Sequence, residues 1–244
     1  MQSVSVAVVV PLANEEATFH IFIDALKKVL INLPETIVYL VTDNASKDNT
    51  VKLCDAASAN DKRVKHIHAP ENKNVVDAYL AGIKEAVRNK HDFIIEMDGG
   101  MSHNPAQLVD FVTQYKNGFE CVWGSRYVNS TAENKSAIGR KLLSRIGTVL
   151  SNLMLGTKLK DMTSGYQGLS LAAAKQLTEY HLKSTAHFYQ TEVRYLLRFK
   201  RQIEIPIQYH SPSPNVKLKF ILNAVNVLLY YFICRITGNA KKIR

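Results

Sequence analysis

Residues 92–105 have the clearest capacity for chemistry, because an apolar run ends there in Asp98, two glycines, a short polar turn and Pro105. An apolar run followed by turn residues predicts a buried strand, and a proline suits the first turn of a helix. Asp98 is therefore expected at the carboxyl end of a strand, where open α/β sheets bind ligands. A carboxylate there can ligate Mg²⁺ or Mn²⁺ and so hold a diphosphate. Taken alone, the stretch fits better an ordinary strand-to-helix loop whose aspartate caps the helix.

Alternating elements surround this stretch and must position it. Further strands are predicted at 4–10, 37–41, 64–68, 120–123 and 203–209, with a strand and turn at 161–166. Helical patterns end near residues 30, 58 and 89, cover 105–115 and 138–155, and include Glu192 and Arg194. Strands that alternate with helices predict an α/β fold with a mostly parallel, doubly wound sheet flanked by helices. A chain of 244 residues that is 46% apolar can bury the core of one compact domain.

The charge of the chain predicts an anionic partner. The formal net charge is +10 and the pI is near 9.4, which suits a nucleotide, a nucleic acid or a membrane surface. No nucleic acid partner is expected, because the chain has no recognised motif and no basic strip interleaved with aromatic residues. Cys54, Cys121 and Cys234 form no metal pattern and no disulfide framework, which is typical of a reducing compartment. The first apolar run, 4–10, is too short for a signal peptide and no basic residue precedes it.

The C-terminal tail, residues 215–244, is basic and contains no acidic residue. Its apolar run, 220–234, is interrupted by Asn223 and Asn226 and is shorter than the ~20 residues that a membrane span needs. One interpretation is an interfacial helix attracted to anionic lipid. The other is a helix packed on the domain or in a homodimer, and the sequence supports the two equally.

Six motifs occur in a fixed order along the chain. They are Val8-Val-Val-Pro11-Leu-Ala-Asn14-Glu15, Thr42-Asp43-Asn-Ala-Ser-Lys-Asp48-Asn-Thr50, Asp98-Gly-Gly-Met-Ser-His-Asn-Pro105, Gly124-Ser-Arg-Tyr127, Gly139-Arg140-Lys-Leu-Leu-Ser144 and Asp161-Met-Thr-Ser-Gly165-Tyr166. Over residues 4–210 this series resembles the inverting family-two glycosyltransferases. Within them it is most similar to the dolichyl-phosphate mannose synthases and polyprenyl-phosphate glycosyltransferases. The resemblance implies a GT-A, Rossmann-like fold.

By this resemblance the first half binds a nucleotide-diphosphate sugar. The donor-binding residues it implies are Pro11, Asn14, Glu15, Asp43, Asn44, Lys73, Asn74, Asp98, Gly99 and Gly100. A carboxylate and an amide at a strand end, such as Asp43 and Asn44, can hydrogen-bond a base or ribose. Turn and cap chemistry is the alternative, which is favoured for Asp48 but not for Asp43. For Lys73 and Asn74, solvated loop positions are nearly as well supported as a donor role.

The chain departs from its relatives at the metal site and at the last loop. The relatives carry Asp-x-Asp, whose two carboxylates hold the cation on the donor diphosphate, whereas this chain has Asp98-Gly99-Gly100. Asp98 can still bind one Mg²⁺ or Mn²⁺ if waters and phosphate oxygens supply the other ligands. The identity of the metal and the need for it stay open. The usual arginine after the last strand is also absent, and Lys217 or Lys219 is its candidate substitute.

The resemblance places the acceptor in the second half. Arg126 suits the leaving diphosphate because a guanidinium presents a fixed fork of donors, with a structural ion pair as the alternative. Arg140 and Ser144 are four residues apart and so share a helix face, and the resemblance assigns them to the acceptor phosphate. Asp161 is placed near the reaction centre. It either orients or deprotonates the nucleophile or, slightly favoured, holds Arg126 or Arg140 in position.

These observations predict an inverting glycosyltransferase that moves a sugar from a nucleotide-diphosphate sugar to a polyprenyl phosphate. Residues 1–210 are expected to form the GT-A domain, with a donor half at 1–118 and an acceptor half at 119–210. The tail, 211–244, is expected to contact the cytoplasmic membrane face, a membrane subunit or a second copy of the chain. Two alternatives stay open. One is transfer to a glycan hydroxyl, with Asp161 as the base; the other is a degenerate nucleotide-binding domain without catalysis.

Overall fold

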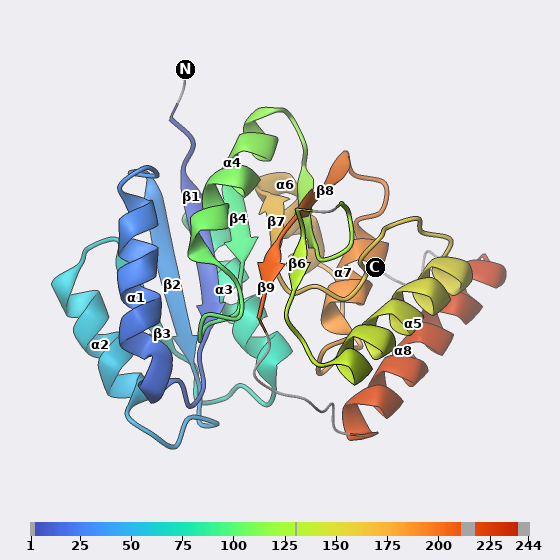
Figure 1. Ribbon diagram of the computed structural model, residues 1–244, viewed down its shortest axis with the longest axis horizontal. Helices are drawn as coiled ribbons and strands as arrows, with labels where there is room; N and C mark the ends of the chain where they lie inside the picture. The colour runs from blue at the N-terminus through green and yellow to red at the C-terminus, as the bar shows by residue number, and fades with distance from the viewer. Residues whose placement is uncertain (1–2, 130, 211–217, 239–244) are drawn as a thin grey trace.

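A seven-stranded sheet forms the centre of the computed structural model, which describes residues 3–129, 131–210 and 218–238 (Figure 1). The strand order is β3-β2-β1-β4-β7-β5-β8, and of these seven strands only β7 runs antiparallel to its neighbours. The strands are β1 (Val6–Pro11), β2 (Thr36–Thr42), β3 (Val64–His68), β4 (Phe93–Glu96), β5 (Cys121–Ser125), β7 (Gln167–Ser170) and β8 (Gln202–Pro206). Two short strands, β6 (Glu133–Asn134) and β9 (Gln208–Tyr209), pair separately. The mostly parallel α/β sheet that the sequence predicts is confirmed.

Helices cover both faces of the sheet. They are α1 (Glu16–Leu30), α2 (Thr50–Asn60), α3 (Val75–Arg88), α4 (Leu108–Lys116), α5 (Ile138–Leu155), α6 (Leu171–Thr178), α7 (Tyr189–Leu196) and α8 (Leu218–Ile236). A short 3₁₀ turn, η1 (Pro105–Gln107), leads into α4, and the side chain of Asn104 accepts the N–H of Ala106 there. The helix start that Asn104 and Pro105 predict is therefore present.

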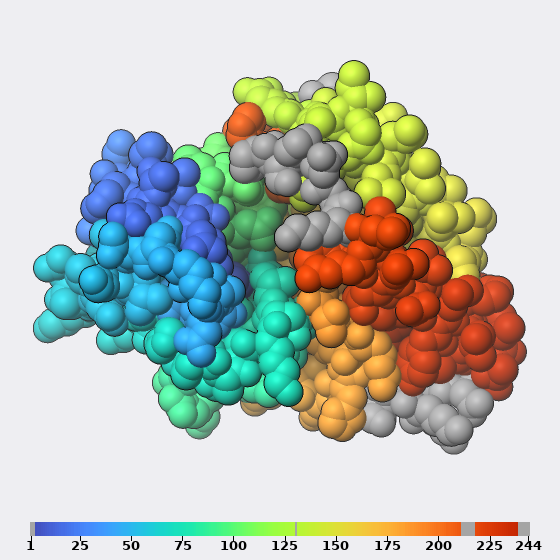
Figure 2. Space-filling model, turned by 90° about the horizontal axis from the view of Figure 1, so that it is seen from below, coloured from blue at the N-terminus to red at the C-terminus, as the bar shows by residue number. Residues whose placement is uncertain are grey.

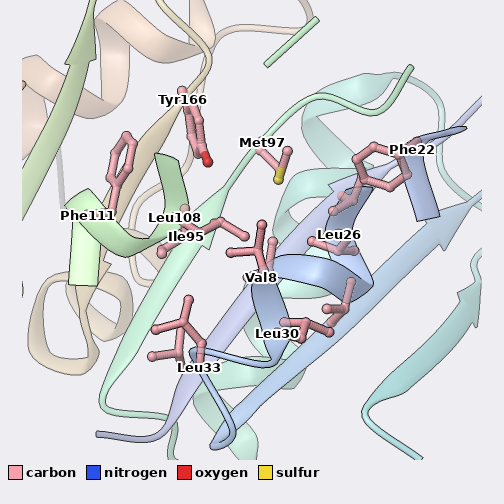
Figure 3. Close-up of a cluster of buried hydrophobic side chains, with 14 of the residues drawn as sticks. Val8, Phe22, Leu26, Leu30, Leu33, Ile95, Met97, Leu108, Phe111 and Tyr166 are labelled. Atoms are coloured by element: carbon pink, nitrogen blue, oxygen red, sulfur yellow. The ribbon is translucent and has the colours of Figure 1, made fainter. Parts of the chain in front are cut away.

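The alternation of side chains along β1 divides the core into two layers. Val8 points to the face that α1, α2 and α4 cover, where it packs near Ile95 of β4 and Phe22 of α1 (Figure 3). Val9 points to the opposite face, which α3, α6 and α7 cover. A strand that is buried on both faces is continuously apolar, as the run at the start of the chain is.

The segment 161–166 differs from its prediction. It is an irregular loop, and the strand β7 follows it at residues 167–170. The side chain of Asp161 accepts the backbone N–H of Thr163 at 3.1 Å, and this local bond favours a turn over an extended strand. The helix α6, which the sequence did not indicate, begins directly after β7 with Ser170 as its N-cap.

The C-terminal helix α8 lies beside α5 on one flank of the molecule (Figures 1 and 2). It has 19 residues, more than the apolar run suggested, and by length and composition it could cross a membrane. In this structure one side of α8 packs on the domain, where the hydroxyl of Tyr231 donates to Glu192 Oε1 at 2.6 Å. Pro212 and Pro214, which follow the expected end of the domain at residue 210, and the candidate Lys217 lie outside the described residues.

Candidate active site

Asp98 follows β4 at the carboxyl edge of the sheet, as the sequence predicts. The hydroxyl of Tyr79, on α3, donates a short hydrogen bond to Asp98 Oδ1. The backbone N–H of Asp98 donates to His103 Nδ1 at 3.0 Å, so this nitrogen carries no proton. Burial lowers the pKa of His103, which keeps the ring neutral. Asp98 is thus held from two sides, and its side chain is still 39% exposed.

Glu15 occupies the space beside Gly100, where the relatives have their second aspartate. A Cβ atom at position 100 would lie 2.3 Å from Glu15 Oε2, and the φ of Gly100 is +65°, which disfavours any other residue. Glu15 Oε2 also accepts the hydroxyl of Thr18 at 2.7 Å. The loop is therefore built for glycine at position 100, with a carboxylate from the β1–α1 loop beside it.

The loops after β1 and β2 are tied to each other by side chains from the donor set. Asn14 has a φ of 59°; its Nδ2 donates to the carbonyl of Ala45, and its Oδ1 accepts the N–H of Lys47 at 2.8 Å. Asp43 accepts the N–H of Ala45 at 2.8 Å, which is Asx-turn geometry. Asn44 donates to the carbonyl of Pro70 at 3.1 Å. The Asn14 bonds hold the loops after β1 and β2 together, and the Asn44 bond ties the second of these to the loop after β3.

The remaining donor candidates also make local contacts. Asp48 accepts the N–H of Thr50 at 3.0 Å and the N–H of Glu16, so it caps helix starts as its alternative interpretation expects. Asn74 is the N-cap of α3, where it accepts the N–H of Val76 at 2.9 Å. Pro11 ends β1, and Lys73 is exposed in the loop that precedes α3.

Arg126 and Asp161 form a buried, bidentate ion pair at the end of β5. Arg126 Nε and Nη2 donate to the two oxygens of Asp161 at 2.8 Å each, and the two residues are 7% and 0% exposed. Burial acts to raise the pKa of Asp161, but the guanidinium of Arg126 outweighs it and the pKa is lowered. Asp161 is therefore a fixed anion that holds Arg126 in place.

Ser144 and Thr163 complete this cluster. Arg126 Nη2 donates to Ser144 Oγ at 2.8 Å and to Thr163 Oγ1 at 2.6 Å, and the two hydroxyls lie 2.6 Å apart. Ser144, assigned by resemblance to the acceptor phosphate, is thus already bonded within the protein. Thr163 was not among the expected site residues, although it belongs to the motif that begins at Asp161.

A cavity of about 400 Å³ joins Asp98 to the Arg126 cluster, and the other donor candidates do not line it. Asp98, Arg126 and Arg140 lie on its wall together with Ser144. Apolar side chains of α5 and α8 form much of the rest of the wall: Leu143, Ile146, Leu150, Ile221, Val225 and Leu228. The cavity therefore combines charged groups at the sheet edge with an apolar lining between two helices.

A buried polar network lies beneath Asp98. Tyr79 stacks on Tyr189 with 5.5 Å between ring centroids, and the hydroxyl of Tyr189 donates to Glu96 Oε1 at 3.1 Å. Gln167 donates to the other oxygen of Glu96 and accepts from Arg194 Nη1 at 3.0 Å. Burial raises the pKa of Glu96 to about 8, so its carboxyl is largely protonated at neutral pH.

Glu96→Gln is expected to remove a pH dependence of folding. The folded-state pKa is raised from 4.5 to about 8, so the stability contributed by the neutral carboxyl is full below pH 4.5 and is lost as the pH rises to about 8. At about 1.4 kcal/mol per pKa unit, the loss is on the order of a few kcal/mol. Urea unfolding at pH 5 and pH 8 measures it. Relative to the wild type, the free energy of unfolding of the variant should be higher at pH 8 than at pH 5. An equal difference between the two proteins at both pH values would contradict the raised pKa of Glu96.

Tyr79→Phe is expected to weaken divalent-metal binding about 10-fold or more, because partners that orient a metal-binding carboxylate contribute about that much. Mn²⁺ titration in the presence of a nucleoside diphosphate measures the change. Tyr189→Phe is the matched control, since it removes a hydroxyl from the same aromatic pair but one that bonds Glu96. Equal weakening in both variants would show that Tyr79 acts only through packing.

The metal that the fold family implies can be tested against these residues. Within the described ranges, no three His, Cys, Asp or Glu side chains are grouped to hold a metal ion. A single partly exposed carboxylate, Asp98, at a sheet edge still fits a cation that takes its other ligands from phosphates and water. The residues fit a cation that binds together with its substrate rather than a cage made by the protein alone.

The sheet is an open α/β sheet, a class of fold in which ligands bind at the carboxyl edge, where loops from several parallel strands meet. The sequence matches glycosyl transferase family 2 over residues 7–178, so the chain belongs to that family and is a glycosyltransferase. The expected family is confirmed.

Two curated relatives match most of the chain. An undecaprenyl-phosphate mannosyltransferase of Micrococcus luteus is 28% identical over 206 residues, which is 84% of this chain and 83% of the relative. A polyprenol monophosphomannose synthase of Mycolicibacterium smegmatis is 26% identical over 205 residues, 83% of this chain and 76% of the relative.

A solved structure confirms the fold. Glucosyl-3-phosphoglycerate synthase from Mycobacterium tuberculosis, in complex with Mn²⁺, uridine diphosphate and phosphoglyceric acid, superposes with a TM-score of 0.66 at 15% identity. The match covers 93% of this chain and 78% of the synthase. The GT-A fold that the sequence predicts is therefore present.

Proposed function

We propose that this glycosyltransferase transfers a sugar from a nucleotide-diphosphate sugar to a polyprenyl phosphate, with inversion at the anomeric carbon. The observation that carries the proposal is the cavity, because Arg140 and Arg126 share its wall with a lining of apolar side chains from α5 and α8. A ligand that fits such a cavity has an anionic head and an apolar chain. Both curated relatives are named for polyprenyl-type phosphate mannosyl transfer, which supports the same acceptor class.

The donor occupies the first half of the chain, 1–118, at the edge formed by the loops after β1, β2 and β4. Glu15 and Asp43 lie there with groups that can hydrogen-bond a ribose or base. Asp98 is the residue that would hold Mg²⁺ or Mn²⁺, and the cation, when bound, would offset negative charge on the diphosphate. The manganese complex of the structurally similar synthase supports a divalent cation in this fold.

In the acceptor half, 119–210, basic side chains offset the repulsion between two anionic substrates. A phosphate monoester is mostly dianionic near neutrality, since its second pKa is about 6, and so needs little help from a base to attack the anomeric carbon. Arg126, fixed by Asp161, faces the cavity near Asp98 and is suited to the charge that develops on the leaving diphosphate. Arg140, 14 positions later on α5, is the candidate for the acceptor phosphate.

The flank formed by α5 and α8 is suited to the cytoplasmic membrane face, where the protein would bind peripherally. The two helices contain no acidic residue, and apolar side chains on both are exposed to solvent. The most exposed are Ile138 at 84%, Leu153 at 70%, Leu218 at 69% and Ile236 at 63%. The tail, 211–244, would thus contact the membrane together with α5, the helix that contains Arg140. A large exposed apolar patch marks a membrane or protein contact, and the basic residues beside it favour anionic lipid.

Transfer is tested with a panel of labelled nucleotide sugars, polyprenyl phosphate and Mg²⁺ or Mn²⁺, by scoring label that passes into organic solvent. We expect one donor to label the organic phase. Nucleotide binding without transfer from any donor would overturn the proposal and favour a glycan acceptor or a non-catalytic domain.

Membrane binding is tested separately with the double variant Leu153→Gln, Leu218→Gln and flotation on vesicles that contain anionic lipid. Losing two apolar side chains from the contact should weaken binding roughly 100-fold or more, at about 1.5–3 kcal/mol for each buried side chain. The double variant Ile21→Gln, Ile31→Gln is the matched control, because it removes two exposed apolar side chains at α1, away from this flank. Unchanged flotation of the double variant would remove this flank from the membrane contact.

A further inference from the structure

A second cavity, of about 460 Å³, lies at the C-terminal ends of α5 and α8 and is separate from the candidate active site. Among the described residues its wall includes four basic side chains, Lys158, Arg194, Arg198 and Arg235, and no acidic side chain. Gly156, the C-cap of α5, also lines it. The two cavities share no lining residue, although on α5 the wall of the first ends at Ser151 and that of the second begins at Leu155. From Arg140 to Gly156 the helix rises about 24 Å at 1.5 Å per residue.

Arg194, a residue of this wall, has two guanidinium donors that are closed off from solvent and lack a partner in the described part of the chain. The residue is fully buried, and its Nη1 donates to Gln167 and to the carbonyl of Gln190. Its Nε and Nη2 are buried and have no hydrogen-bond partner among the described residues. The guanidinium lies over the ring of Trp123, with 5.0 Å from Cζ to the ring centroid. This cation–π contact gives the N–H groups of Nε and Nη2 no hydrogen-bond acceptor. A buried donor without a partner is costly, and a charged one more so.

The other two arginines are held at the cavity by their Nη1 atoms. Arg235 Nη1 donates to the carbonyl of Met154 at 2.8 Å and to that of Leu153 at 3.2 Å, at the end of α5. Arg198 Nη1 donates to the carbonyl of Tyr195 at 2.7 Å. The carbonyls that give a helix C-terminus its partial negative charge are therefore covered by a cation, and the cavity keeps its positive character.

We propose that this basic cavity binds a phosphate group, supplied either by the headgroup of an anionic phospholipid or by a free phosphate. Arginine is the side chain best suited to phosphate because its planar fork can donate two parallel hydrogen bonds. The cavity lies at the end of the exposed α5–α8 flank, so a lipid headgroup there would anchor the flank about 24 Å from Arg140. This assignment does not depend on which acceptor the transferase uses.

The first experiment titrates inorganic phosphate into the full chain by calorimetry, in an Arg140→Ala background that removes the candidate acceptor contact. We expect saturable binding that Arg198→Gln and Arg235→Gln each weaken 10-fold or more. Arg201→Gln is the matched control, because Arg201 lies over Phe119 and outside the cavity wall. Arg198→Lys keeps the charge and should retain part of the affinity, and circular dichroism confirms that each variant is folded.

Equal phosphate affinity in Arg198→Gln, Arg235→Gln and Arg201→Gln would overturn the proposal, as would no saturable binding at all. The second experiment compares capture by phosphatidylglycerol and phosphatidylcholine vesicles. If Arg198→Gln loses the preference for phosphatidylglycerol, the ligand is a lipid headgroup. If it loses only the binding of inorganic phosphate, the ligand is a free phosphate. Failure of sugar transfer would leave both results unchanged, so the two proposals fail separately.

Discussion

Asp161→Asn is expected to lower the free energy of unfolding by about 3–5 kcal/mol, because it leaves the buried guanidinium of Arg126 without its charge partner. Transfer should fall roughly 100- to 1,000-fold in kcat/KM, the size of effect seen when a fixed donor to developing charge is lost. Urea unfolding and steady-state kinetics measure the two changes. The variant must be assayed well below its unfolding midpoint so that lost activity is not simply lost protein.

A double-mutant cycle separates the two roles that the sequence leaves open for Asp161. If Asp161 acts by holding Arg126, then Arg126→Met combined with Asp161→Asn should be no less active than Arg126→Met alone. If Asp161 is instead a general base for a hydroxyl acceptor, its loss should lower kcat further in the Arg126→Met background. Multiplicative losses would therefore contradict the positioning role and favour the glycan acceptor. The bidentate geometry and the lowered pKa of Asp161 both favour positioning.

Arg140→Ala is expected to raise the KM for polyprenyl phosphate about 10- to 100-fold, since a hydrogen bond to a charged group contributes about 1.5–3 kcal/mol. The KM for the nucleotide sugar should change little, because the proposed donor residues lie on the loops after β1, β2 and β4, whereas Arg140 lies on α5. Both constants come from varying one substrate at saturating concentrations of the other.

Arg145→Ala is the matched control for Arg140. It removes the same charge from the same helix, but Arg145 lies over the ring of Tyr127, 5.1 Å from the centroid, and not on the cavity wall. If both variants raise the acceptor KM equally, the helix attracts its substrate by general charge and Arg140 is not a specific phosphate contact. If neither does, a glycan hydroxyl acceptor gains support.

The sequence was sufficient to predict the fold class and the position of Asp98 at the edge of the sheet. Strands such as β1 and β4 are continuous apolar runs because both their faces are buried, and this pattern is visible without coordinates. Asp98 directly follows such a run, so its position at the sheet edge was predictable. The order of the motifs also indicated the family, which the match over residues 7–178 confirms.

The partners of the site residues were decided by the tertiary structure. The sequence left Arg126 and Arg140 open as partners of Asp161, and the structure pairs it with Arg126, 35 positions away. Tyr79 and Asp98 are 19 positions apart, and no local pattern predicts their bond. Glu15 and Gly100 meet only because β1 and β4 are neighbours in the sheet. The apolar cavity likewise requires α8 to lie beside α5. Helical and strand periodicity reports which face of an element is buried but not which side chain lies opposite, and that choice belongs to the packing of distant elements.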